Sequence, residues 1–168
     1  MKIIGSVKED PATDKRVSVI PETAKKFIEL NFSVFLEKGY SEHLNVADEE
    51  YKNKGTSFNN SAQEVLSKSE VILKVNCPSN DEINLIKEKS VLIGQFDPLS
   101  DKEKLNKLIT KNINIFSLNL LPRITRAQSM DVLSSQANLA GYRAVIESVE
   151  EFGKVIPMMM TAAGTITP

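Results

Sequence analysis

The chain has 168 residues, of which 41% are hydrophobic and 26% are charged, a composition that excludes general disorder. At roughly 150 residues per domain, we expect one domain, or one domain and a portion of a second. The net charge of −1 argues against a nucleic-acid-binding protein, which normally carries a basic excess. One cysteine and one histidine exclude an internal disulfide and a Cys/His zinc cluster, and they favour an intracellular protein without a metal site.

No stretch of the sequence is typical of a signal peptide or a membrane span. The first apolar run, Ile3-Ile4, is far shorter than the roughly 7–15 residues that a signal peptide needs. No segment approaches the roughly 20 apolar residues of a transmembrane helix. We therefore expect a soluble chain, which can still serve a membrane assembly.

Short apolar runs alternate with segments of helical spacing through the first two thirds of the chain. The apolar runs predict strands at residues 3–7, 32–36, 71–75, 91–94 and 113–118. Helices are expected between them, from Pro21 to about Asn31, over 47–54, from the capping-box residue Ser61, over 79–87 and over 101–110. Repeated β-then-α units with near-continuous apolar strands predict an α/β fold, a Rossmann-like open and largely parallel sheet flanked by helices.

The last third of the chain has a different pattern. No proline interrupts residues 128–152, and apolar side chains recur there at steps of three and four, which predicts one long helix ended by Gly153. One face of it carries the small residues Ala137, Ala140, Gly141 and Ala144, which would let another backbone approach closely. Residues 154–168 show no periodicity and are expected to be a linker, with Met158 to Met160 as adaptable packing for a partner.

Two nucleotide-binding motifs are missing from the glycine pattern. The seven glycines lie at positions 5, 39, 55, 94, 141, 153 and 164, so no two are within three residues of each other. Neither G-x-G-x-x-G nor a phosphate-binding loop can be built from them. We therefore expect no pyrophosphate site of the usual kind within this chain.

The segment between the last predicted strand and the long helix is the strongest candidate site. Arg123, Gln128, Asp131 and Ser134 supply a cation, an amide, a carboxylate and a hydroxyl, and the last three follow one side of a helix start. They lie after a strand, where α/β sheets form ligand crevices. Such groups could bind ribose hydroxyls and a carboxamide. Helix capping with a surface ion pair explains the same residues and stays open.

Four further residues are weaker candidates. Lys74 interrupts an apolar strand, so it is either paired, facing a cleft, or extending to solvent from the strand end. Arg16 follows a charged loop and is expected to be solvated. His43 lies in a polar run and is expected at the surface, and Cys77 is expected to end a strand as a small apolar residue. A Ser-His-Asp triad would depend entirely on His43.

Residues 122–144 closely resemble the alpha subunit of proton-translocating NAD(P) transhydrogenase, of the alanine dehydrogenase/transhydrogenase family. The block is Pro-Arg-Ile-Thr-Arg-Ala-Gln-Ser-Met-Asp-Val-Leu-Ser-Ser-Gln-Ala-Asn-Leu-Ala-Gly-Tyr-Arg-Ala. Supporting stretches are Arg16-Val17 with Ile20-Pro21, Ile72 to Pro78 and Thr161 to Gly164, so the resemblance is collinear over essentially the whole chain.

The resemblance implies a soluble NAD(H)-binding component that exchanges hydride directly with NADP(H) on a beta component, while a membrane domain moves protons. It implies that Arg123, Gln128, Asp131 and Ser134 bind the nicotinamide end and ribose of NAD. It also implies a homodimer of the complete component, at the cytoplasmic side of the inner (plasma) membrane. No catalytic side chain is needed, because direct hydride transfer depends on orientation rather than on a base.

The resemblance also implies a domain plan. Residues 1–127 would form the N-terminal α/β domain, 128–153 a connecting helix, and 154–168 a linker towards an NAD-binding Rossmann domain absent from this sequence. We expect these residues alone to be inactive. The alternatives are an alanine dehydrogenase-like fragment and a non-catalytic docking module. The dehydrogenase carries a histidine after the strand equivalent to 91–94, where this chain has Gln95 to Pro98, and its keto-acid-binding cations match Arg16 and Lys74.

Overall fold

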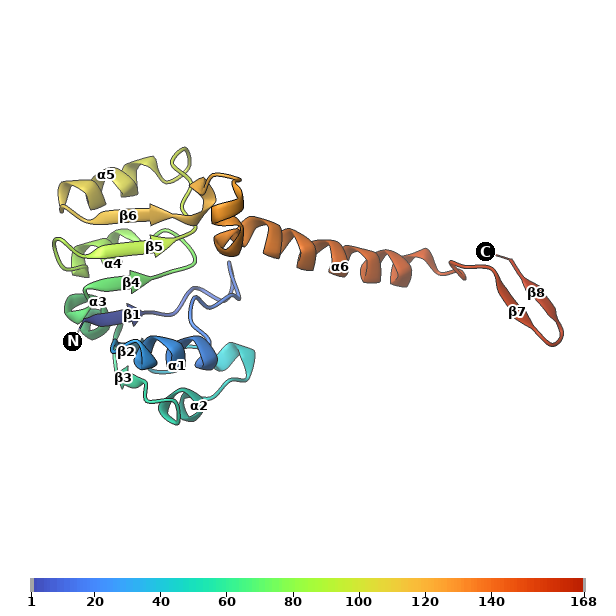
Figure 1. Ribbon diagram of the computed structural model, residues 1–168, viewed down its shortest axis with the longest axis horizontal. Helices are drawn as coiled ribbons and strands as arrows, with labels where there is room; N and C mark the ends of the chain where they lie inside the picture. Colours follow the sequence, from blue (N-terminus) through green and yellow to red (C-terminus); the bar gives the residue numbers. More distant parts are fainter. Residues whose placement is uncertain (1, 168) are drawn as a thin grey trace. The chain divides into compact units, whose positions relative to one another are not determined.

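The computed structural model describes residues 2–167, which divide into two compact units. Unit 1 spans Met1–Leu121 and unit 2 spans Pro122–Pro168. Unit 1 is an α/β domain built on one sheet. Unit 2 consists of a short 3₁₀ helix, a long helix and a hairpin (Figure 1).

Six strands form the sheet of unit 1, in the order β3-β2-β1-β4-β5-β6, and every neighbouring pair is parallel. This confirms the predicted open, largely parallel α/β sheet. Each of the five predicted strands is present, within one or two residues of its expected ends. The strands are β1 (Ile3–Ser6), β2 (Ser33–Glu37), β3 (Ser57–Asn59), β4 (Val71–Leu73), β5 (Val91–Gly94) and β6 (Asn114–Ser117).

Helices connect the strands as crossovers, because parallel neighbours cannot be joined by a tight turn. They are α1 (Pro21–Glu29), α2 (Asp48–Lys52), α3 (Ala62–Lys68), α4 (Asn80–Leu85) and α5 (Lys102–Thr110), with 3₁₀ helices η1 (Glu42–Leu44) and η2 (Leu118–Leu120). The local start signals act as predicted. Pro21 is the first residue of α1, and Ser61 and Ser79 accept hydrogen bonds from the backbone of Glu64 and Glu82.

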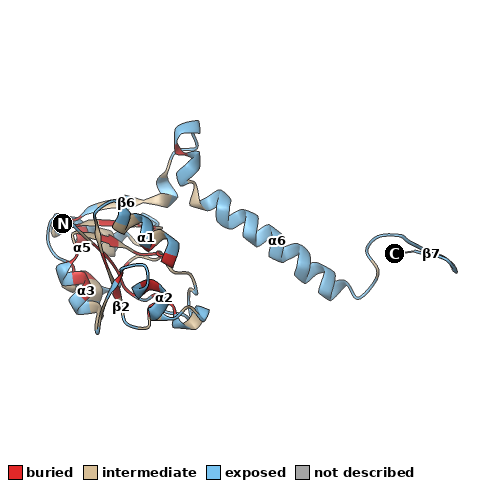
Figure 2. Cartoon of the chain, turned by 60° about the horizontal axis from the view of Figure 1, so that its bottom comes forward, coloured by how far each residue is buried: buried red, intermediate tan, exposed pale blue. Residues whose placement is uncertain are grey.

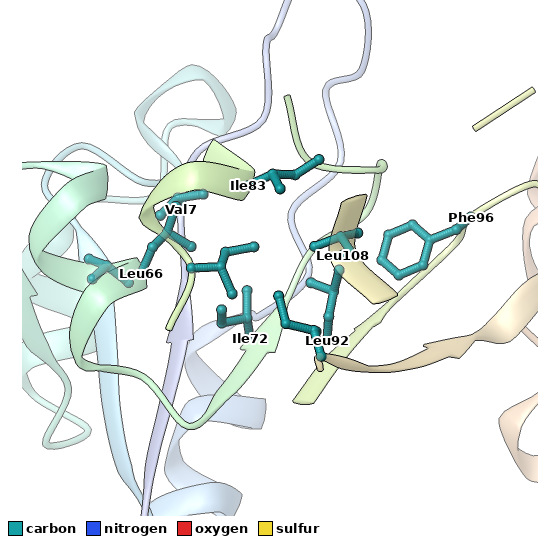
Figure 3. Close-up of a cluster of buried hydrophobic side chains, with 10 residues drawn as sticks. Val7, Leu66, Ile72, Ile83, Leu92, Phe96 and Leu108 are labelled. Atoms are coloured by element: carbon teal, nitrogen blue, oxygen red, sulfur yellow. The ribbon is translucent and has the colours of Figure 1, made fainter. Parts of the chain in front are cut away.

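Two apolar clusters lie on opposite faces of the sheet. On one face, residues of α3, α4 and α5 pack against β4 and β5, as Figure 3 shows for Leu66, Ile83 and Leu108 around Ile72 and Leu92. On the other face, Ala24, Tyr40 and Tyr51 pack against Val34 and Leu36 of β2. Successive strand residues point to opposite faces, so both clusters follow from continuous apolar runs.

Unit 2 begins with η3 (Thr125–Met130), continues with α6 (Val132–Phe152) and ends in a hairpin of β7 (Met159–Thr161) and β8 (Gly164–Ile166). Gly153 has a φ of 63° and ends α6, as expected for a glycine after a helix. No residue of α6 is buried, and Figure 2 shows the helix as exposed along its length. No helix among residues 2–167 is both long and apolar enough to cross a bilayer.

Three local expectations differ from the structure. The long helix begins at Val132 rather than at 128, because Asp131 has a ψ of 86° and caps the helix, and the turn before it is 3₁₀. Residues 159–166, expected to be irregular, form a two-stranded hairpin that turns at Ala162-Ala163. Strand β3 was not predicted, because three residues between polar flanks have no clear pattern; its pairing with β2 creates it.

Candidate functional site

The predicted site residues lie in the segment that opens unit 2. Arg123 precedes η3, Gln128 is within it, Asp131 caps α6, and Ser134 is in the first turn of α6. The side chains of Arg123, Gln128 and Ser134 are exposed, and Asp131 is half-buried. One short stretch thus presents all four groups.

Asp131 and Ser134 are brought into direct contact. Asp131 Oδ1 accepts the Ser134 backbone N–H at 3.0 Å, and Oδ2 accepts the Ser134 hydroxyl at 2.6 Å. These hydrogen bonds, with a smaller contribution from the charge of Arg123, lower the pKa of the Asp131 carboxyl. Asp131 is therefore an anionic cap for α6, so the capping interpretation is correct for this residue.

Arg123 and Gln128 are not engaged in the same way. Neither side chain makes a hydrogen bond or an ion pair with any other residue among 2–167. The guanidinium offers up to five N–H donors, and the amide offers two donors and an acceptor. The segment can therefore offer uncommitted donors and an acceptor to a polar ligand beside a fixed helix start, which fits the hydroxyls and carboxamide of a nicotinamide nucleoside.

Lys74 occupies a second polar cluster, at the carboxyl edge of β4. It is 5% exposed, and its Nζ lies 2.6 Å from Glu82 Oε1 and 3.8 Å from Glu9 Oε2. Glu9 also accepts the backbone N–H groups of Val75 at 2.7 Å and of Asn76 at 3.4 Å. Of the alternatives left open for Lys74, the structure has the paired one.

Arg16 is paired rather than simply solvated, which corrects the expectation. Its Nη2 donates to Asp14 at 2.7 Å, its Nε donates to the same carboxylate, and its Nη1 donates to Gln95 Oε1 at 2.9 Å. The Arg16 hydrogen bond is the largest cause that lowers the pKa of Asp14 to about 2. Asn76 Nδ2 donates to both Glu9 and Asp14, so the two ion-pair groups form one network.

The remaining candidates have no catalytic arrangement. The His43 ring lies 2.9 Å from the Lys15 carbonyl oxygen at an exposed position. Cys77 is half-buried, and burial raises the pKa of its thiol to about 11. A surface depression of about 680 Å³, lined by residues between Lys38 and Lys52, contains none of the predicted site residues.

Sequence reasoning missed the partners of the two cations. Glu9, Asp14 and Gln95 lie in loops that show no periodicity. Glu82 carried one usable signal, because it stands three residues after Ser79 in a capping box. That signal locates α4 but does not show that the same carboxylate also binds Lys74.

Comparison with known proteins gives one consistent result. Residues 5–140 match the family described as "Alanine dehydrogenase/PNT, N-terminal domain". The first of the parts that make up the NAD(P) transhydrogenase alpha subunit of Rhodospirillum rubrum is 41% identical over 100% of this chain and 45% of its own length. The protein of the same name from Rickettsia prowazekii is 38% identical over 99% of this chain and 44% of its own length.

A solved structure agrees with these relatives. The transhydrogenase from Sinorhizobium meliloti superimposes with a TM-score of 0.89 and 41% identity, over 98% of this chain and 49% of that one. The chain thus spans about half the length of the relatives it matches. It belongs to the alanine dehydrogenase/PNT family, and over its full length it is similar to the alpha subunit of NAD(P) transhydrogenase.

Proposed function

We propose that this chain is the N-terminal portion of the NAD(H)-binding component of a proton-translocating transhydrogenase. The observation that carries the proposal is the similarity to transhydrogenase alpha subunits over the whole chain, including the segment with Arg123 and Gln128. In the complete complex, hydride would pass between NAD(H) here and NADP(H) on a beta component. A membrane domain would couple that transfer to proton movement.

Arg123 and Gln128 are the residues that we assign to the cofactor. The Gln128 amide can donate to and accept from a carboxamide or a ribose hydroxyl, and the Arg123 guanidinium can donate to carboxamide or phosphate oxygens. The nicotinamide, when bound, supplies the hydride donor or acceptor. Asp131 and Ser134 bind each other, so we assign them to fixing the segment, with the Ser134 oxygen still able to accept a hydrogen bond.

This arrangement suits a reaction that needs orientation and no protein base. Direct transfer between two rings requires each ring to be held at a productive distance and angle. Exposed donors on a capped segment can restrict the ring on one side while its other face stays open to the partner. The absence of a catalytic histidine in the sequence segment after β5 is consistent with this role.

We infer the partners from the same relatives. They are the NADP(H)-binding beta component, the membrane domain and a second copy of the complete component, at the cytoplasmic side of the membrane. The apolar side chains of α6 support a packing role for this helix. They are exposed in the described chain: Leu133, Leu139, Tyr142, Val145, Ile146, Val149 and Phe152.

The test is Gln128→Ala in the complete NAD(H)-binding component, assayed with its partners by cyclic transhydrogenation. We expect the hydride-transfer rate to fall on the order of 100-fold and the NADH dissociation constant to change less, because orientation acts mainly in the transition state. Arg123→Ala should change both quantities. Gln63→Ala, at an exposed position on α3, is the matched control and should change neither. Near-normal turnover in the Arg123→Ala/Gln128→Ala double variant would contradict the assignment.

A further inference from the structure

The buried network around Lys74 lies where an α/β domain would ordinarily accept a ligand. Lys74 follows β4, Glu9 lies in the loop after β1, and Gln95 follows β5, so the network occupies the carboxyl edge of three adjacent strands. Ligands of open α/β sheets bind at this edge. A buried ammonium here would ordinarily be a binding point for an anion.

The ammonium is already matched by groups of the chain itself. Only 4% of the Lys74 side chain is exposed, and the side chains of Glu9 and Glu82 are 6% and 19% exposed. Glu82 is additionally held by its capping box, where Oε2 accepts the Ser79 N–H at 2.7 Å. Glu9 is held by the backbone N–H of Val75. Both carboxylates are thus fixed in place by contacts that do not depend on Lys74.

The charges and the packing both oppose a small anion. Three carboxylates, Glu9, Asp14 and Glu82, share the network with two cations, Lys74 and Arg16, so it carries an excess of negative charge. The backbone beside it is tightly packed. A methyl group added at Gly94 would overlap the Lys74 carbonyl oxygen and the ring of Phe96.

We propose that Glu9 and Glu82 are specificity-determining residues that bind Lys74 from within the chain and close this edge of the sheet to small carboxylate ligands such as 2-oxo acids. The same contacts tie the loop after β1 and the start of α4 to the end of β4. This inference concerns unit 1 and does not depend on the cofactor proposed for unit 2.

The first measurement is the midpoint of thermal unfolding of the whole 168-residue chain in sodium pyruvate and in sodium chloride at equal ionic strength. For the unchanged chain we expect the same midpoint in both salts, because Lys74 has no free valence for a carboxylate. A midpoint raised by pyruvate to the extent seen in the variants below would overturn the proposal.

The second measurement uses Glu9→Gln/Glu82→Gln, which leaves Lys74 without a counter-ion. We expect a lower midpoint in chloride and a recovery of about 2–6 °C in ~20 mM pyruvate, because a ligand that binds the folded state raises its stability. Adding Lys74→Met should abolish the recovery. Glu29→Gln, which removes the carboxylate of the exposed Lys25–Glu29 pair, is the matched control and should show no pyruvate effect.

If the double variant does not fold, Glu82→Gln alone decides the question. Glutamine at this position retains the capping box, so the change isolates the charge opposite Lys74. A smaller pyruvate shift of the same sign supports the proposal. No pyruvate effect in the folded glutamine variants would show that Glu9 and Glu82 do not control access to Lys74, and the proposal would be wrong.

Discussion

Asp131 and Ser134 form a closed pair at the start of α6, in which one carboxylate accepts both the backbone N–H and the hydroxyl of the same serine. The pair separates four residues that look equivalent in the sequence into two kinds. Asp131 and Ser134 satisfy each other, whereas Arg123 and Gln128 keep their polar atoms for something outside the described chain.

This division predicts a graded response at Asp131 in the complete NAD(H)-binding component. Asp131→Asn keeps a capping side chain, so we expect hydride transfer within about 3-fold of normal. Asp131→Ala removes the acceptor for both Ser134 bonds, and displacement of Gln128 should lower the rate on the order of 10- to 100-fold. Cyclic transhydrogenation measures both rates. Equal rates for the two variants would mean that capping does not position the site.

The 168-residue chain by itself should bind NADH weakly or not at all. Its glycines form no pyrophosphate-binding turn, so the proposed contacts reach only the nicotinamide end of the cofactor. Titration of NADH fluorescence with the purified chain is the measurement. A micromolar dissociation constant would show that the binding determinants have been misplaced.

Stability at acid pH should depend on Asp14. Its pKa is lowered from 3.8 to about 2 in the folded chain, so its contribution to stability is present above about pH 4 and is lost as the pH falls towards 2. Asp14→Asn should therefore destabilise the chain at pH 7, and the difference from the unchanged chain should shrink between about pH 4 and 2. Urea unfolding midpoints across this range test it. A difference that is constant with pH would contradict the ion-pair explanation.

Cys77 should react slowly with alkylating reagents while the chain is folded. Burial raises the pKa of its thiol to about 11, so at about pH 8 the folded chain holds far less thiolate than an ordinary cysteine. We expect alkylation by iodoacetamide to be about 10- to 100-fold slower than in the urea-unfolded chain, since the thiolate is the reacting species. Equal rates would show that the thiol is accessible and normally ionised.

Local patterns were sufficient for most of unit 1. Apolar runs such as Val71 to Val75 predict buried strands, and Ser61 and Ser79 each mark a helix start by a capping spacing. These signals need only neighbouring residues. The start of α6 was missed by four residues because Asp131 had the same apparent periodicity as its neighbours, and only its backbone conformation shows that it is a cap.

The sequence by itself determined the alternating α/β plan, the parallel sheet, the long helix ended by Gly153, and the segment from Arg123 to Ser134 that carries the family resemblance. The tertiary structure alone decided which residues surround the buried cation. Glu9 and Val75 are 66 positions apart and are joined by a hydrogen bond because β1 and β4 are neighbours in the sheet. Periodicity reports the face on which a residue lies, whereas a counter-ion is chosen by which strand ends meet, and that depends on strand order across the whole sheet.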